Sequence, residues 1–227
     1  MKKGSRKFIL SKLKSAPTGK KVSPLRTLGD APSKPSWLNA EAHIGSLKRI
    51  AKDLLVDLEI SRDHQDTQYF LNSIIQRHGI KSCLAWHHPL IKSAGIPEML
   101  VSKGITFRDT FRSHEDFKGY CAEADLGITA ADALIMESGT LVTRAKRGWE
   151  RGTSLLPPVH LVLVDAARVL SRITDLPAVL TQWFTAGSNS PSAIHLISGP
   201  SKTADIEFTL VLGVHGPKAV YILAMVR

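Results

Sequence analysis

The chain has 227 residues, 43% of them hydrophobic, and carries a formal net charge of +10 at pH 7. That length accommodates one domain with a substantial core, and the hydrophobic fraction is typical of a globular protein. No apolar run approaches the roughly 18 residues of a membrane span, which argues against a membrane-spanning protein.

The positive charge is concentrated at the start of the chain. Ten lysines and arginines and one aspartate precede residue 35, so this part carries +9 of the +10 and the remainder only +1. We predict a basic, partly disordered extension over residues 1–35 and an α/β domain over residues 36–227. The extension is interpreted either as an arm for a polyanion or as a solvated, partner-contacting segment. Nucleic acid is disfavoured because no aromatic residue interleaves the charges between Phe8 and Trp37.

The extension also lacks the features of an export signal. Its longest apolar run, residues 8–10, has three residues, which is shorter than the roughly 7–15 of a signal-peptide core. We therefore predict a cytoplasmic protein.

The spacing of apolar residues predicts the elements of the first half. Residues 36–62 have apolar side chains at three- and four-residue intervals, which predicts one helix; residues 65–78 predict a second, with Tyr69 on its core face and Gly79 after its end. The next segments predict a strand over 80–86, a helical return over 89–103, a strand over 105–107, a helix over 114–124 and a strand over 125–129. Repeated strand–helix–strand units predict a parallel sheet covered by helices.

The second half is predicted to be richer in strands. Residues 159–164 are almost continuously apolar, which is typical of a fully buried parallel strand. Further segments predict strands over 133–136, 140–143, 193–197 and 219–226, and helices over 176–184 and 203–212. Phe184 is predicted on the buried face of the first of these helices. The second is predicted because Thr203 ahead of Asp205 is typical of a helix start.

Two loops of this half hold most of the polar residues that are suited to chemistry. In the first, residues 127–140, the turn Glu137-Ser138-Gly139 separates two strand-length apolar runs, so a hairpin places the carboxylate at a strand end. In the second, residues 198–207, a turn leads into the predicted helix, whose free N–H groups can hold an anion. We therefore predict a small carboxylate or phosphate ligand bound by Thr129, Asp132, Ser138, Gly139, Thr140, Ser198, Gly199, Ser201, Thr203 and Asp205.

Glu137 and His215 are the predicted catalytic residues. A carboxylate at a desolvated strand end can have its pKa raised toward neutrality and act as an acid, base or nucleophile. The other interpretation of Glu137 is a structural carboxylate that accepts hydrogen bonds from backbone N–H groups of the Ser198 loop. His215 stands in the turn before the last strand, where it is either catalytic or a helix-capping residue. For His160, inside the buried run, a core or strand-end position is favoured over catalysis.

Two further groups also have two interpretations. His87 and His88 follow a predicted strand, where open α/β sheets bind ligands, so one of them is either a ligand contact or a loop residue. Adjacent histidines on an extended chain point to opposite sides, which disfavours a shared metal site. The basic run at residues 144–152 is either a clamp for an anion or a solvated loop.

The sequence predicts no metal site and no cofactor in this chain. Its two cysteines, Cys83 and Cys121, are 38 positions apart, without the paired spacing of a zinc site, and an iron–sulfur cluster needs about four thiolates. Neither a Gly-x-Gly-x-x-Gly turn after a strand nor a Gly-x-x-x-x-Gly-Lys-Ser/Thr phosphate loop is present.

Four ordered segments, residues 127–140, 153–160, 198–207 and 212–217, resemble the lactate-utilisation protein C family, whose domain is the LUD domain. The resemblance implies a three-layer α/β/α fold with a mainly parallel sheet, similar to the sugar-phosphate isomerase and CoA-transferase folds. It also implies a non-redox subunit that works with two iron–sulfur partner proteins in oxidising L-lactate to pyruvate. The iron–sulfur clusters are then expected on the partners.

An alternative function follows from the same resemblance. CoA-transferases of the similar fold use a glutamate that precedes a small residue and glycine, as Glu137 does here. A stand-alone enzyme of the CoA-transferase or isomerase type would use Glu137 on a thioester or phosphorylated substrate. Turnover or a covalent glutamyl adduct in the isolated chain would distinguish such an enzyme from a subunit.

Overall fold

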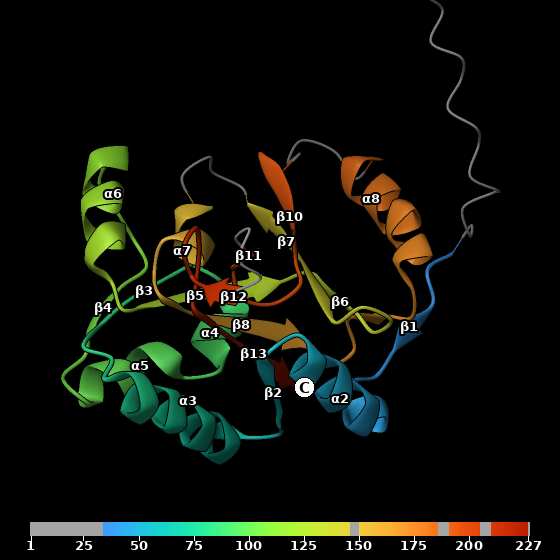
Figure 1. Ribbon diagram of the computed structural model, residues 1–227, viewed down its shortest axis with the longest axis horizontal. Helices are drawn as coiled ribbons and strands as arrows, with labels where there is room; N and C mark the ends of the chain where they lie inside the picture. Colours follow the sequence, from blue (N-terminus) through green and yellow to red (C-terminus); the bar gives the residue numbers. More distant parts are fainter. Residues whose placement is uncertain (1–33, 146–149, 186–190, 205–209, 227) are drawn as a thin grey trace, which may run out of the picture. The chain divides into compact units, whose positions relative to one another are not determined.

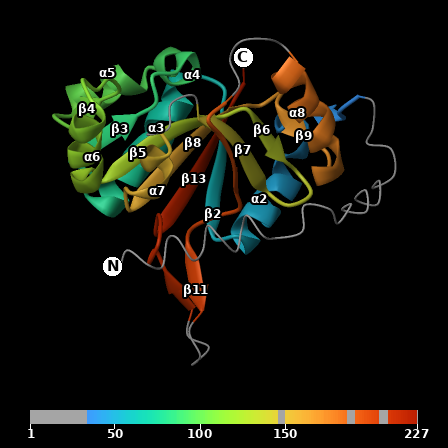
Figure 2. The same cartoon turned by 90° about the horizontal axis from the view of Figure 1, so that it is seen from above.

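The computed structural model of the protein describes residues 34–145, 150–185, 191–204 and 210–226. All of them belong to one unit, Pro32–Arg227. The predicted extension over residues 1–35 lies almost wholly outside the described residues, so its boundary and its partners stay predictions. The described part contains a parallel sheet, a mainly antiparallel sheet and a short hairpin (Figures 1 and 2).

A six-stranded parallel sheet forms the centre of the fold. Its order is β2-β13-β8-β5-β3-β4, and every neighbouring pair is parallel. The strands are β2 (Val56–Ser61), β13 (Ala219–Met225), β8 (Val159–Asp165), β5 (Leu126–Ala131), β3 (Ser82–Ala85) and β4 (Thr106–Arg108). β13, β8 and β5 are buried along almost their whole length because both faces of the sheet are covered. The predicted fold class, α/β with a mainly parallel sheet, is confirmed.

Three helices cover one face of this sheet (Figure 1). They are α3 (His64–His78), α4 (Pro89–Ser93) and α5 (Ile96–Ser102). Their buried residues, among them Leu71, Ile74 and Leu100, pack with the strands in one hydrophobic cluster. α3 begins where the Asp63 carboxylate accepts from the N–H groups of residues 65 and 66, and it ends at Gly79, whose φ is 62°. A left-handed residue closes a helix in this way, so the predicted end at Gly79 is confirmed.

The other face is covered partly by helices and partly by a second sheet of order β1-β9-β6-β7-β10. The helices are α2 (Ile44–Asp53), α6 (His114–Glu123) and α7 (Gly152–Leu155), and the strands are β1 (Trp37–Leu38), β9 (Val169–Leu170), β6 (Ala133–Ile135), β7 (Thr140–Ala145) and β10 (Ala193–Ile197). Leu134 and Leu141 of this sheet pack against Val162 of the parallel sheet. The outer side of the second sheet is covered by α8 (Leu176–Thr185), which follows the 3₁₀ helix η2 (Ile173–Asp175) and contributes Val179. The predicted hairpin of residues 133–143 is therefore confirmed as β6 and β7.

The single helix predicted over residues 36–62 is wrong. The chain forms β1, a 3₁₀ helix η1 (Glu41–His43), α2 and then β2. Leu55 has a φ of 63° between α2 and β2, and a left-handed residue there ends the helix. In β2, buried apolar residues alternate with the more exposed Asp57 and Glu59, which is the period of two expected for a strand.

The helix predicted over residues 203–212 is also wrong. β11 (Lys202–Ala204) and β12 (Leu210–Leu212) pair antiparallel, with Thr203 opposite Val211. Cross-strand pairing of β-branched side chains outweighs the capping pattern here. The hairpin extends away from both larger sheets (Figure 2). The expected anion site at a helix start is therefore not formed, and the predicted ligand residue Asp205 lies outside the described residues.

The other predicted elements are confirmed, β10 with its predicted ends and the rest with shifted ends. They are β3, the helical return α4 and α5, β4, α6, β5, β8, α8, β10 and β13. Two aromatic side chains predicted in the core are instead exposed, Tyr69 to 81% and Phe184 to 53%. Each lies on a helix whose apolar stripe is already filled by neighbours, Phe70 in α3 and Val179 in α8.

Candidate functional site

The carboxyl ends of β3 and β5 mark the point where the chain leaves the parallel sheet toward opposite faces. After β3 the chain enters α4 on the face covered by α3, whereas after β5 it enters β6 and β7 on the other face. Open α/β sheets bind ligands in the crevice at such a point, because neither connection covers it. A cavity of about 90 Å³, here called the switch-point cavity, is lined by Trp86, His87, His88, Ala130, Asp132, Arg144 and Glu150.

An ion pair between Asp132 and Arg144 forms one side of the switch-point cavity. Asp132 directly follows β5, and Arg144 lies in β7. The Arg144 guanidinium donates to Asp132 Oδ1 through Nε at 2.8 Å and through one terminal nitrogen, and the Arg144 N–H donates to Oδ2 at 3.0 Å. The guanidinium carbon lies 4.2 Å from the centre of the Trp183 ring. These contacts hold a cation at the cavity, and among the described residues no hydrogen bond from its second terminal nitrogen is seen.

Two histidines after β3 line the cavity and are held by different contacts. His87 Nδ1 lies 2.8 Å from Asp109 Oδ2, and a carboxylate acceptor assigns the proton to Nδ1, which leaves Nε2 of the neutral ring as a base. His88 Nδ1 accepts from the Leu90 N–H at 3.2 Å and so caps α4, which assigns the proton of the neutral ring to Nε2. Both histidines line one cavity, although alternation along an extended chain predicts opposite sides.

Trp86 and Ala130 supply the apolar part of the cavity lining. The Trp86 side chain is buried, and its indole N–H donates to the Glu150 carbonyl oxygen at 2.9 Å, which fixes the ring. The cavity therefore combines histidine rings, the Asp132–Arg144 ion pair, the acidic residue Glu150 and a small apolar surface. Such a set suits a small molecule that carries a carboxylate and a hydroxyl group.

The family model of the LUD domain matches residues 49–225 of this chain. The chain belongs to the LUD domain family. The family resemblance expected from the four sequence segments is thereby confirmed.

Curated relatives agree with this assignment. The chain is 37% identical over 158 residues to Lactate utilization protein C of Shouchella clausii, a match that covers 67% of this chain and 66% of the relative. It is 35% identical over 153 residues to Lactate utilization protein C of Bacillus subtilis, with 67% and 59% covered. The chain thus spans slightly less than two thirds of these relatives.

A solved structure agrees with the fold of this LUD domain. The crystal structure of a DUF162 family protein from Deinococcus radiodurans superposes with a TM-score of 0.52 at 15% identity. The superposition covers 83% of this chain and 99% of that chain. At this identity the likeness concerns the fold alone.

The predicted loop residues of the LUD domain do come together, but they contact one another. Ser138 Oγ lies 2.8 Å from Thr140 Oγ1, which lies 2.8 Å from Ser198 Oγ, so the three hydroxyl groups form a chain. A Cβ on Gly139 would lie 2.7 Å from Leu54 Cδ1, and a Cβ on Gly199 would lie 2.7 Å from the Leu54 carbonyl oxygen. Here the glycines allow the two loops to pack closely on the end of α2. None of these residues lines the switch-point cavity, and their predicted ligand contacts stay predictions.

The two predicted catalytic residues lie apart from the switch-point cavity. Glu137 Oε2 accepts from the Ile173 N–H at 3.1 Å, and the Glu137 N–H donates to the Ser171 carbonyl oxygen at 3.2 Å. This is the contact of a structural carboxylate, although its donor is not in the predicted loop at residues 198–207. His215 is exposed in the turn after β12. Ser201 bonds through its backbone to Gly213 and Pro217 beside the same turn.

Thr129 and His160 form a buried pair inside the LUD domain. Both are 0% exposed, and Thr129 Oγ1 lies 2.9 Å from His160 Nε2. Burial lowers the pKa of His160 from 6.5 to about 3, so the ring is neutral. The core position that the sequence favours for His160 fits this environment. The Thr129 hydroxyl contacts the His160 ring inside the core.

The described residues hold no group of three or more histidine, cysteine or acidic side chains that could bind a metal ion. Cys83 and Cys121 are both buried free thiols, and burial raises the pKa of each. Among the helices of the described ranges, none is long and apolar enough to cross a membrane.

Sequence reasoning found part of the switch-point cavity. It selected Asp132 as a ligand residue and named His87, His88 and the basic run that starts at Arg144. It missed Asp109, the partner of His87, whose available signal was its position two residues after a predicted strand, where carboxyl ends of parallel strands meet ligands. Trp86 and Glu150 carried no comparable signal, because only the tertiary contact brings them together.

Proposed function

We propose that this LUD domain binds a small hydroxy- or oxo-carboxylate in the switch-point cavity and serves lactate utilisation as a component without its own redox cofactor. The observation that carries this proposal is the position of the fixed Arg144 guanidinium beside the His87–Asp109 pair at the switch point of the sheet. The name Lactate utilization protein C, borne by relatives at 37% and 35% identity, supports the choice of pathway.

The chemistry of L-lactate matches the groups that line the cavity. Its carboxylate pairs with the guanidinium nitrogen of Arg144 that Asp132 leaves open, as a charge-assisted hydrogen bond. His87 Nε2 accepts the proton of the hydroxyl group, and Asp109 stabilises the imidazolium that forms. The methyl group lies toward Trp86 and Ala130. In this arrangement the chain orients the substrate and takes one proton.

Oxidation of lactate to pyruvate breaks the O–H and the Cα–H bond and releases two protons and two electrons. His87 takes the hydroxyl proton, so the Cα proton and both electrons pass to acceptors outside this chain. The sequence offers only two cysteines, fewer than the about four thiolates of an iron–sulfur cluster. We therefore assign the electrons to iron–sulfur clusters on two partner proteins. The alternative, a stand-alone enzyme that uses Glu137 on a thioester or phosphorylated substrate, gains no support from the hydrogen bond of that carboxylate to Ile173.

Ligand titration of the full chain tests the cavity. Isothermal titration with L-lactate, pyruvate and inorganic phosphate is compared for the wild type, Arg144→Gln and Arg168→Gln. Arg168 is the matched control, because its guanidinium carbon also stacks on a tryptophan, 5.2 Å from the Trp37 ring centre, but does not line the cavity. We expect carboxylate binding that Arg144→Gln weakens by at least about tenfold and the control leaves unchanged. Equal binding by both variants would refute the site.

Reconstitution tests the role in the pathway separately. Lactate-dependent electron transfer is measured for the iron–sulfur partners with and without this chain, and again with Arg144→Gln. We expect transfer only when the wild-type chain is present. Full activity of the partners alone would refute the subunit role, whatever the titration gives.

A further inference from the structure

β2 is one outer strand of the parallel sheet. It pairs with β13 in an unbroken register from Val56 opposite Val220 to Ser61 opposite Met225, and no other strand in the described ranges pairs with it. The strand contains no proline and no bulge. Its outward N–H and C=O groups therefore present a regular row to which another extended chain can add.

A groove runs along this free edge. Its volume is about 640 Å³, and it lies between α2 and α3. It is lined by Lys48, Lys52, Val56, Asp57, Leu58, Glu59, Ile60, Asp66, Tyr69, Phe70, Ser73 and Arg77. Tyr69 is 81% exposed at this groove. A large exposed aromatic side chain beside an open strand edge is typical of an interface anchor.

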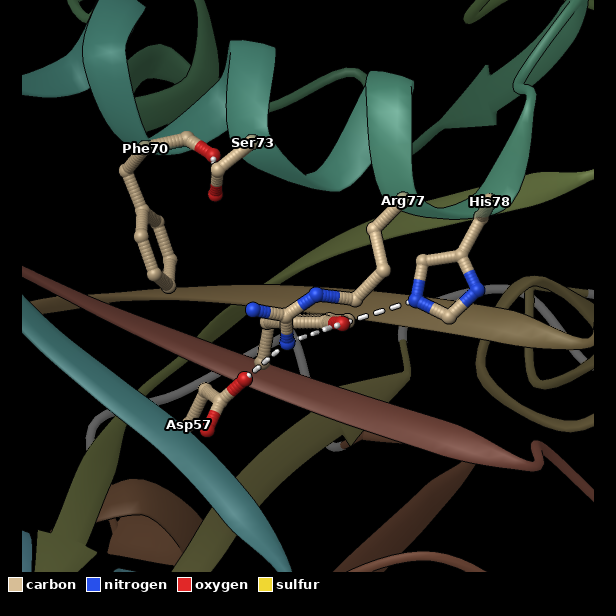
Figure 3. A network of polar contacts seen from close by, with 6 residues as sticks. Asp57, Phe70, Ser73, Arg77 and His78 are labelled. Atoms are coloured by element: carbon tan, nitrogen blue, oxygen red, sulfur yellow. Dashed lines mark hydrogen bonds and ion pairs between the residues drawn. The ribbon is translucent and has the colours of Figure 1, made fainter.

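Polar contacts fix one wall of the groove (Figure 3). Arg77 reaches from α3 to Asp57 of β2 at 2.6 Å and to the Tyr221 hydroxyl of β13 at 3.2 Å. The Tyr221 hydroxyl also lies 2.7 Å from His78 Nε2. These contacts place Arg77 and Asp57 at the edge of the sheet, with side chains 59% and 56% exposed.

The two ends of the groove carry opposite net charges. α2 precedes β2 and α3 follows it through short turns, so both helices run antiparallel to the strand. The amino-terminal end of the groove accordingly carries Lys52, Asp57 and Arg77, a net charge of +1. The carboxyl-terminal end carries Lys48, Glu59 and Asp66, a net charge of −1.

The opposite charges of the two ends indicate which partner fits the groove and in which direction its strand runs. When two copies of the groove meet antiparallel about a two-fold axis, the positive end of each lies beside the negative end of the other, whereas a parallel arrangement places like ends together. We propose that a second copy of this chain adds its β2 antiparallel to the free edge of β2 and joins the two parallel sheets. The exposed Lys48–Glu59 pair, with side chains 45% and 47% exposed, rearranges at little cost.

Analytical ultracentrifugation of the full chain over a concentration series tests this interface. The wild type is expected to dimerise. Lys52→Glu and Asp66→Lys each place like charges at the meeting ends, so each weakens the dimer by at least about tenfold. The double variant exchanges the signs of both ends and restores the dimer. Lys118→Glu on α6, an exposed site away from the groove, makes the same charge change and leaves the dimer intact.

Two controls keep the result interpretable. Circular dichroism checks that each variant is folded, and the double variant contains both substitutions, so its recovery excludes misfolding as the cause of weaker dimerisation. Hydrogen exchange is expected to slow with increasing protein concentration at the amides of β2 that point away from β13. A wild type that stays monomeric, or a dimer that neither charge variant weakens, overturns the proposal.

Discussion

The buried His160 ring makes the stability of this LUD domain depend on pH in a calculable way. In the folded protein the ring is fully buried, with a pKa of about 3 against 6.5 for an exposed histidine. The unfolded chain therefore binds a proton below pH 6.5, and the folded chain does not. The stability contributed by the neutral ring is fully present above 6.5 and is lost progressively as the pH falls toward 3.

The size of this effect follows from the two pKa values. Between pH 8 and pH 5, the linkage relation gives a loss of about 2 kcal/mol in the free energy of unfolding from this one group. His160→Gln removes the titration but keeps an amide group within reach of the Thr129 hydroxyl, which bonds His160 Nε2 at 2.9 Å. The variant is expected to lose about 2 kcal/mol less than the wild type over the same interval.

Urea unfolding followed by circular dichroism at several pH values between about 5 and 8 measures both proteins. His78 and His195 also have lowered pKa values because of burial, but they are present in both proteins and cancel in the difference. If the two proteins lose the same free energy between these pH values, the His160 ring is not held neutral by burial.

Three further outcomes are expected. Gly127→Ala places a Cβ 1.9 Å from the Thr153 carbonyl oxygen, a backbone atom that does not move easily, so the free energy of unfolding in urea falls by about 3 kcal/mol. Thr140→Val removes the central member of the hydroxyl chain and lowers the same quantity by about 1–2 kcal/mol, because the neighbouring hydroxyls lose a partner. Cys83 and Cys121 are buried, with the pKa of Cys121 at about 11, so neither thiol reacts with a chromogenic disulfide in the native protein at pH 8 and both react in urea.

The strands of the central sheet could be predicted from the sequence, because burial on both faces requires nearly continuous apolar runs. Residues 159–164 and 219–226 predict β8 and β13 for this reason. The end of α2 could not be predicted from the sequence. The apolar residues at positions 54 and 58 fit the spacing of a helix as well as the alternating pattern of the strand β2. Only the left-handed φ of 63° at Leu55 separates the two elements, and a leucine gives no sign of that conformation.

The candidate site could be predicted only in part from the sequence, and the reason lies in the topology of the sheet. The loops at residues 127–140 and 198–207 stand out because glycine and hydroxyl residues gather there, and these residues instead join the loops to each other and to α2. The switch-point cavity is assembled from the ends of β3 and β5 and from β7. Segments so distant in sequence come together only through the strand order, which no local pattern encodes.

Asp132 belongs both to the loop at residues 127–140 and to the lining of the switch-point cavity. The hydroxyl chain fixes the turn between β6 and β7 and so sets the course of β7 toward Arg144, but Arg144 itself is held by Asp132 and by the Trp183 ring. A substitution in the loops should therefore change loop packing without changing ligand binding. Thr140→Val is expected to lower stability without changing carboxylate affinity, whereas Arg144→Gln lowers affinity and also removes the ion pair with Asp132. Loss of affinity in a folded Thr140→Val protein, measured by the same titration, would mean that the loops contact the ligand after all.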